Sequence, residues 1–234
     1  MFYSKSTPMN IVPTLTSDTG ETSSRNLNKE QALFMWHQLL IEVLKRMPPT
    51  SVSQNDLLTE CRLEYSGNNT ELRKIQDFED TYDADNVIEW YTRDTFLYRL
   101  LNKALRTKNI VVIFKFRFVL VDLHNRLAQL HPDYICSLQS QTETKSELVV
   151  FRGQGLTVAE LQSLKDNVNA QIAMNSFLST SISSETALGF AGNGSGRPII
   201  ESVFFEIHCP VKNYHTKPFA NVQKSNLARE THFT

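Results

Sequence analysis

Two polar stretches in the second half of the sequence carry side chains that can do chemistry. Each follows an apolar run, and they are Arg152-Gly153-Gln154 and Ser179-Thr180-Ser181. A guanidinium stays charged at any working pH and pairs bidentately with phosphate oxygens. Three hydroxyls at the end of a buried strand need hydrogen-bond partners. These residues therefore either cap the elements around them or hold a ligand.

The elements expected around these stretches are short strands and one helix. After about residue 145 the sequence consists of β-rich runs, which are ELVVFRGQ, SFLSTSI and IIESVFFEIHCP. Between the first two lies LTVAELQSLKDNV, a predicted helix in which Thr157 and Glu160 have the spacing of a capping box. The GNGSG stretch at 192–196 lacks the spacing of a dinucleotide fingerprint and is interpreted as a hairpin loop before the last strand.

The first half of the sequence has helical periodicity. Apolar residues at spacings of three and four predict an amphipathic helix from Asn28 to Met47, which Pro48 and Pro49 end. Further helices are expected at 57–63, 72–78, about 85–107 and 114–130. The expected fold class is thus α+β, a helical N-terminal half followed by a β-rich half. The predicted organisation is a flexible leader at 1–27, a helical region at 28–84 and a domain at 85–234.

Composition excludes several function classes. Lys and Arg total 24 and Asp and Glu total 25 among 234 residues, so no basic field argues for a nucleic-acid partner. The three cysteines and six histidines show no metal-ligand spacing, so no metal is predicted. No apolar stretch approaches a signal-peptide core or the roughly 20 residues of a membrane span. The expectation is a cytoplasmic protein with no membrane partner.

The ordered set of motifs resembles a known enzyme family. Arg152, Ser179-Thr180-Ser181 and Lys217-Pro218-Phe219-Ala220, with YTRDTFLYRLLNKALR before them, are similar to the arginine-type mono-ADP-ribosyltransferases. That family carries a triad of Arg, Ser-Thr-Ser and Glu-x-Glu. The resemblance covers about residues 85–226, and it implies a split β-sheet that is incomplete at the C-terminus of this chain.

The resemblance also implies a reaction and a set of site residues. Such enzymes cleave the nicotinamide–ribose bond of NAD, which is a substrate, and transfer ADP-ribose to an arginine of an acceptor protein. It implies that Arg152 grips the pyrophosphate, Gly153 meets the nicotinamide carboxamide and Ser179 faces the nicotinamide ribose. The remaining residues that it places at the nucleotide are Gln154, Thr180, Ser181 and Phe190, the last stacking on the nicotinamide ring. The choice between NAD and NADP stays open.

Each of these residues has a plainer alternative. Arg152 at a strand end can simply face solvent, and Gly153 can be an ordinary turn glycine. The hydroxyls can form a cap for the segment SSETALGF, in which Ser184 could also do this. Phe190 can be a core residue.

The sequence departs from the family at the third triad element. Where a Glu-x-Glu is expected, the chain reads Glu230-Thr231-His232. A neutral imidazole cannot replace the carboxylate that stabilises positive charge on the ribose, and an imidazolium would oppose it. Glu230 is at most a weak substitute, so little transferase activity is expected. A truncated reading of a longer protein and a genuine short form both fit this ending. The alternative function is a non-catalytic module that binds NAD or another protein.

Overall fold

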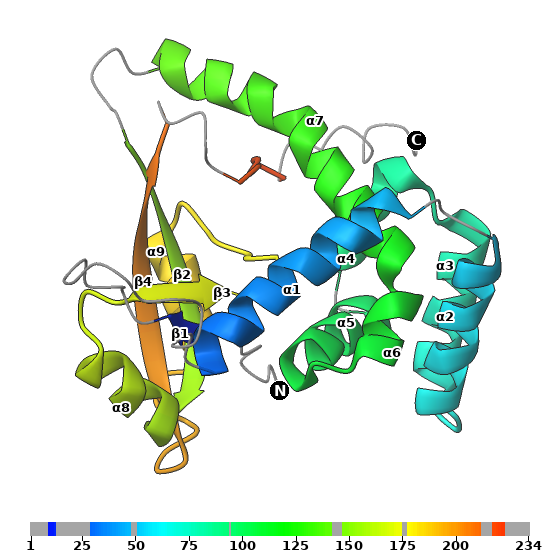
Figure 1. Ribbon diagram of the computed structural model, residues 1–234, viewed down its shortest axis with the longest axis horizontal. Coiled ribbons are helices and arrows are strands. Elements are labelled where there is room, and N and C mark those ends of the chain that lie inside the picture. The colour runs from blue at the N-terminus through cyan, green and yellow to red at the C-terminus, as the bar shows by residue number, and fades with distance from the viewer. Residues whose placement is uncertain are drawn as a thin grey trace, which may run out of the picture. The chain divides into compact units, whose positions relative to one another are not determined.

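The computed structural model describes residues 9–12, 29–47, 51–93, 95–141, 147–174, 177–211 and 217–222. The chain divides into two compact units (Figure 1). The strand unit comprises residues 1–42 and 147–210, and the helical unit comprises residues 43–146 and 211–234. Glu230 lies outside the described residues, so the predicted Glu-x-Glu position has no structural account.

Helices dominate the first half of the described chain, as the periodicity predicts. They are α1 (Lys29–Arg46), α2 (Ser51–Glu64), α3 (Asn69–Thr81), the 3-10 helix η2 (Ala84–Asn86), α4 (Val87–Thr92), α5 (Phe96–Thr107), α6 (Ile110–Lys115) and α7 (Arg117–Gln141). The single helix expected at about 85–107 is interrupted. Arg93 is extended at the C-terminus of α4, and Thr95 is the N-cap of α5. The Thr95 side chain makes no capping hydrogen bond to α5, and its hydroxyl lies 3.4 Å from the carbonyl oxygen of Trp90.

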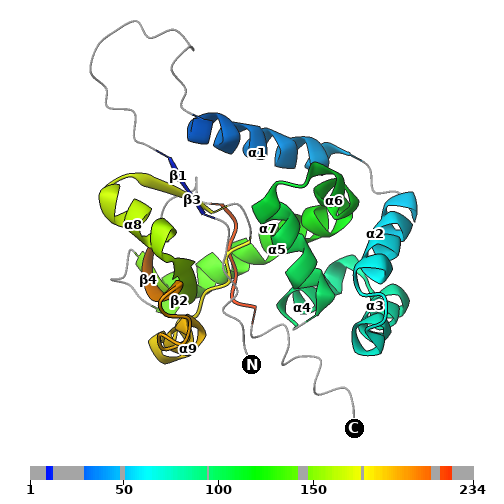
Figure 2. The same ribbon diagram turned by 90° about the horizontal axis from the view of Figure 1, so that it is seen from below.

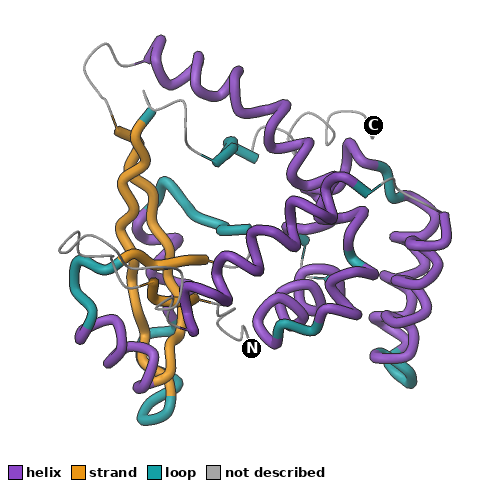
Figure 3. The backbone as a smooth tube through the Cα atoms, viewed as in Figure 1, coloured by secondary structure: helices purple, strands orange, loops and turns teal. Residues whose placement is uncertain are grey.

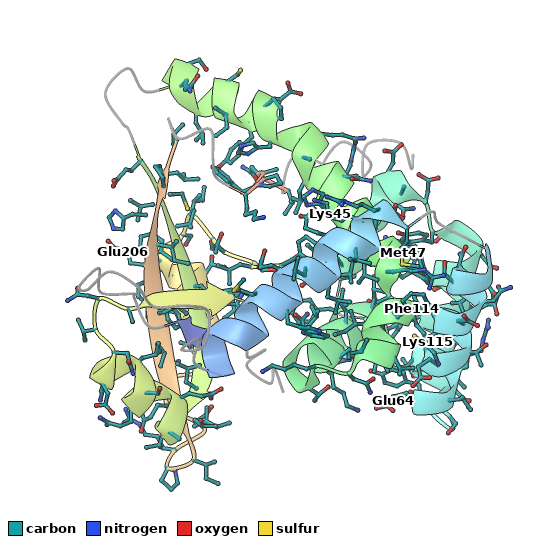
Figure 4. All side chains as sticks on the ribbon, viewed as in Figure 1. Lys45, Met47, Glu64, Phe114, Lys115 and Glu206 are labelled. Atoms are coloured by element: carbon teal, nitrogen blue, oxygen red, sulfur yellow. The ribbon has the colours of Figure 1, made fainter. Side chains whose placement is uncertain are left out.

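The core of the helical unit is aromatic. Phe78 of α3 is fully buried, and its ring centroid lies 5.2 Å from that of Trp90 and 5.6 Å from that of Phe96. Lys115, labelled in Figure 4, reaches from α6 to form an ion pair with Glu60 of α2 at 2.7 Å. Helix α3 lies before residue 84 in the sequence, and helices α4 and α5 lie after it. Because their aromatic rings pack together, the domain boundary expected at residue 84 falls inside one packed core.

The motif at 217–220 belongs to the helical unit. His131 of α7 has its Nδ1 2.8 Å from the carbonyl oxygen of Phe219 and 3.3 Å from the Phe219 nitrogen. The Phe219 ring packs edge-on against His131, with centroids 4.7 Å apart. We expected this motif within the same domain as Arg152, whereas the structure assigns the two to different compact units.

The strand unit is built on one long antiparallel ladder. Strand β2 (Glu147–Thr157) pairs along its whole length with β4 (Ile200–Pro210), and Arg152 lies opposite Phe205. Figure 3 shows the two strands in orange. A second pair joins β1 (Met9–Val12) to β3 (Gln171–Met174). The fold is thus mixed helix and strand, with two two-stranded sheets among the described residues.

Three local expectations differ from the structure. The described part of SFLSTSI, from Phe177, forms a loop with one bridge at Ser181 rather than a strand. Strand β1 lies within the expected leader and gains its hydrogen bonds from β3, a partner remote in sequence. GNGSG joins helix α9 (Ser184–Ala191) to β4, so it is not a hairpin loop. Its Gly192 has φ +83°, a left-handed conformation that suits glycine at a helix C-terminus.

The capping box is confirmed. Helix α8 (Val158–Asp166) begins after Thr157, whose hydroxyl accepts a hydrogen bond from the Glu160 nitrogen at 3.2 Å. In return, the Glu160 carboxylate accepts one from the Thr157 nitrogen at 2.9 Å. These two bonds satisfy backbone donors that a helix start otherwise leaves without partners. The short pattern is sufficient here because all its contacts are local.

Candidate functional site

Arg152 is the centre of the candidate site. It lies in β2 with only 7% of its surface exposed. Its Nε donates to Oε1 of the fully buried Gln154 at 2.9 Å, and its Nη1 donates to the carbonyl oxygen of Ser179 at 2.6 Å. Burial of a guanidinium requires such bonds, because an uncompensated buried charge is costly. The structure thus rules out the solvent-facing alternative for Arg152.

The hydroxyl segment runs along the free edge of β2. Phe151 and Ser181 exchange two backbone hydrogen bonds, 2.7 and 2.8 Å long, in an isolated antiparallel bridge. This bridge and the Arg152 contact fix the segment at two points. Two motifs 27 residues apart in sequence are therefore brought together, through the side chain of Arg152 and a backbone carbonyl.

The three hydroxyls have different environments. The Ser181 Oγ accepts a hydrogen bond from the Ser183 nitrogen at 3.0 Å, and the Ser183 hydroxyl caps α9 through the Thr186 nitrogen at 3.3 Å. Ser181 thus bonds locally, and Ser183 rather than Ser184 is the N-cap. Ser179 and Thr180 are exposed. Their hydroxyls remain the members of this segment best placed to meet a ligand.

Gly153 lies beneath helix α9. A Cβ built on this glycine would lie 1.8 Å from the carbonyl oxygen of Ala187 and 2.7 Å from the nitrogen of Ala191. Figures 1 and 2 both show α9 against β2. The missing side chain is therefore needed for close helix-strand packing. The plain turn alternative is wrong because Gly153 is inside a strand, and its predicted contact with nicotinamide stays a prediction.

Successive side chains of a strand point to opposite faces, so β2 separates two sets of predicted residues. Arg152 and Gln154 point to one face. Helix α9 covers the other, the face of Gly153, and Phe190 belongs to this helix. Phe190 is 58% exposed, so it is not a core residue. Its predicted stacking on nicotinamide stays a prediction.

Glu206 is the strand carboxylate opposite Phe151, and Figure 4 labels it on β4. Residues opposite one another in an antiparallel pair share a face. The Glu206 side chain is consequently on the face away from Arg152. It bonds His208 instead, with Oε1 2.9 Å from Nε2.

We expect the pH titration of His208 to be shifted upward. Hydrogen bonds to Glu206 and then to Glu147 raise its pKa above the ordinary value. Because the folded-state pKa is the higher one, the stabilisation is complete below about pH 6.5 and is lost as the pH rises through the folded pKa. A proton NMR titration of the imidazole should show this upward shift, and Glu206→Gln should lower the midpoint. A midpoint that Glu206→Gln leaves unchanged would contradict the assignment.

A cavity of about 440 Å³ lies elsewhere in the strand unit. Its walls come from α8 and from the segment that begins β4, and they are Val158, Leu161, Gln162, Lys165, Arg197, Glu201 and Ser202. No motif in the sequence singles out this cavity. The helical spacing of 158, 161, 162 and 165 was the available signal, since it places those residues on one face of α8.

We also searched the described part of the chain for a metal site and for a membrane-spanning helix. Among these residues, no three His, Cys, Asp or Glu side chains are grouped so that they could hold a metal ion. None of the helices described is long and apolar enough to cross a membrane. Comparisons with protein-family models, with curated proteins and with solved structures found no match.

Proposed function

We propose that the chain binds NAD at the Arg152–Ser179 cluster and is related in function to arginine-specific ADP-ribosyltransferases. The carrying observation is the 2.6 Å hydrogen bond from the Arg152 guanidinium to the Ser179 carbonyl oxygen. It connects the buried Arg152 to the segment of the exposed Ser179, and these residues belong to the first two elements of the motif set. The finer fold that this function implies, a split sheet extending the β2–β4 ladder, is part of the same proposal.

The proposed reaction divides into two bond changes. The nicotinamide–ribose bond breaks and its electron pair leaves with nicotinamide, so positive charge develops on the ribose. A guanidinium nitrogen of the acceptor arginine then forms a bond to the ribose carbon that nicotinamide has left, and this nitrogen loses a proton. Polar groups fixed in advance lower such a barrier because they need no reorganisation. In this proposal Arg152 holds the Ser179 segment in place, and the exposed Ser179 hydroxyl contacts the nucleotide.

A second candidate function is NAD binding without transfer. The observation that favours it is His232, which stands where the second carboxylate of a Glu-x-Glu is expected. Ground-state binding needs the Arg152–Ser179 cluster alone, whereas the carboxylate acts chiefly as charge develops. Binding and catalysis are therefore separable in this chain.

NAD titration by calorimetry tests the proposed site. Arg152→Ala should weaken NAD binding by roughly tenfold to a hundredfold, since it removes the charge-assisted hydrogen bond that holds the Ser179 segment in place, and such a bond contributes about 1.5 to 3 kcal/mol. Ser179→Ala should weaken it by about fivefold, the equivalent of a neutral hydrogen bond of about 1 kcal/mol. Ser179 is the cleaner position, because its side chain is exposed and the carbonyl that binds Arg152 is retained.

Ser163→Ala provides the matched control, since Ser163 is an exposed serine of α8 outside the cluster. It should leave NAD affinity unchanged. Arg152→Ala also removes a buried charge, so thermal unfolding of each variant must accompany the titration. An unchanged NAD affinity in a folded Ser179→Ala variant, or absence of NAD binding by the unsubstituted chain, would overturn the proposed function.

A further inference from the structure

The cavity between α8 and the start of β4 combines apolar, polar and charged side chains. Its volume of about 440 Å³ is in the usual range for small-molecule pockets. Helix α8 contributes one face, on which Val158 and Leu161 are apolar and Gln162 and Lys165 are polar. Figures 1 and 2 both show α8 beside the end of the β2–β4 ladder.

The opposite wall is fixed by hydrogen bonds. The Gly194 nitrogen donates to the Ser202 Oγ at 2.7 Å, and the Arg197 nitrogen donates to the Gly194 carbonyl at 3.2 Å. The Arg197 side chain is held by Nε, which donates to Oε2 of Glu201 at 2.9 Å. These bonds favour one orientation of the Arg197 side chain, which is 67% exposed, and such pre-organisation reduces the cost of binding.

The charges of the cavity favour an anion. Lys165 and Arg197 are cations and Glu201 is the one anion among the lining residues, which leaves an excess positive charge. Glu201 bonds Arg197 through Nε, and this hydrogen bond uses one of the five N–H donors of the guanidinium. Within the described chain Lys165 forms no ion pair. A phosphate monoester, which carries up to two negative charges, suits two such donors.

The volume and the apolar wall favour a ligand larger than a bare phosphate ion. Val158 and Leu161 offer apolar surface next to the cations. We propose that this cleft binds a small molecule that combines a phosphate monoester with a flat apolar group, such as a nucleoside monophosphate. Lys165 and Arg197 would hold the phosphate, and Val158 and Leu161 would pack against the apolar group.

This site is distinct from the Arg152–Ser179 cluster. The lining residues Glu201 and Ser202 lie opposite Leu156 and Gly155 of β2. Those positions are three and four residues from Arg152, which corresponds to roughly 10 to 13 Å along a strand. The proposal therefore does not depend on NAD binding at Arg152.

The test is equilibrium binding of AMP, adenosine and inorganic phosphate to the full chain at low ionic strength. AMP should bind at least roughly tenfold more tightly than either fragment. Lys165→Gln and Arg197→Gln should each weaken AMP binding about tenfold, since each removes a charge-assisted contact. Glu201→Gln should strengthen it severalfold, because it removes the opposing negative charge while the amide oxygen of Gln can still accept the hydrogen bond from Arg197 Nε.

Two further variants serve as controls. Arg73→Gln removes the same charge from an exposed position of α3 in the other unit, and it should leave AMP affinity unchanged. Leu161→Trp should abolish AMP binding by filling the cleft, and a melting temperature close to that of the unsubstituted chain will show that the variant is folded. Ser179→Ala should leave AMP binding intact, which separates this site from the proposed NAD site.

Several results would overturn the proposal. One is that the chain does not bind AMP at about 5 mM. Another is that adenosine or inorganic phosphate binds as tightly as AMP. A third is that Arg73→Gln changes the AMP affinity as much as Lys165→Gln and Arg197→Gln do. Loss of AMP binding in a folded Ser179→Ala variant would also overturn it, because the ligand would then belong to the Arg152–Ser179 cluster.

Discussion

Gly153→Ala is expected to destabilise the protein by about 3 kcal/mol, at the upper end of the usual cost of overpacking a core. The new Cβ would lie 1.8 Å from the Ala187 carbonyl oxygen, 2.7 Å from the Ala191 nitrogen and 2.9 Å from the Ala187 carbonyl carbon. All three atoms are backbone atoms of α9, so no change of rotamer can relieve the overlap. The helix itself would have to move away from β2. Urea unfolding monitored by circular dichroism measures this loss.

Gly189→Ala is the matched control for that experiment. Gly189 lies in the same helix, is exposed, and would have nothing within 4 Å of an added Cβ. Alanine is favoured over glycine inside a helix by roughly 0.5 to 1 kcal/mol. Gly189→Ala should therefore stabilise the protein slightly. Equal stability changes for the two variants would contradict the packing role of Gly153.

The same pair of variants separates packing from ligand binding. If Gly153 is present for the nicotinamide carboxamide alone, Gly153→Ala should retain its stability and lose NAD affinity. If Gly153 is needed for packing against α9, Gly153→Ala should lower the stability of the protein. The distances to α9 lead us to expect the second result.

His232→Glu is expected to raise ADP-ribosyl transfer by on the order of a hundredfold over the unsubstituted chain. This expectation rests on the proposed transferase function. The substitution restores a Glu-x-Glu at 230–232, and in that function the second carboxylate would act beside the positive charge that develops on the ribose, a role commonly worth several kcal/mol of barrier. NAD affinity should change little, since the carboxylate acts on the transition state rather than on bound NAD. The measurement is transfer of labelled ADP-ribose to an arginine acceptor, together with NAD titration.

Two variants control for the charge and for Glu230. His232→Gln removes the imidazole without adding a carboxylate, so it should leave activity low. Glu230→Gln in the His232→Glu background should reduce transfer again, if both carboxylates are needed. Robust transfer by the unsubstituted chain that Glu230→Gln leaves unaffected would rule out the need for an acidic pair. NAD binding without transfer by His232→Glu would favour the non-catalytic alternative.

Elements with local signals could be predicted from the sequence alone. Pro48 follows the end of α1, the capping box at Thr157 begins α8, and the α+β character follows from the change in periodicity near residue 145. Each of these depends on residues within a turn or two of one another. Backbone dihedral preferences and capping hydrogen bonds act at that range, so they can be identified from short patterns.

The roles of Arg152 and Gly153 depend on contacts that form only in the folded chain. Arg152 is buried because Gln154 and the Ser179 carbonyl compensate its charge, and that carbonyl is 27 residues away. Gly153 serves α9 because the helix lies on its face of β2, a placement that no local pattern specifies. Phe177 and Leu178 favour a strand, yet the described segment is a loop held by one bridge at Ser181. In each case a contact between remote segments outweighs a local preference. Secondary-structure propensities of residues differ by about 1 kcal/mol or less. Burial of a charge, or a steric clash in a core, changes the free energy of folding by several kcal/mol.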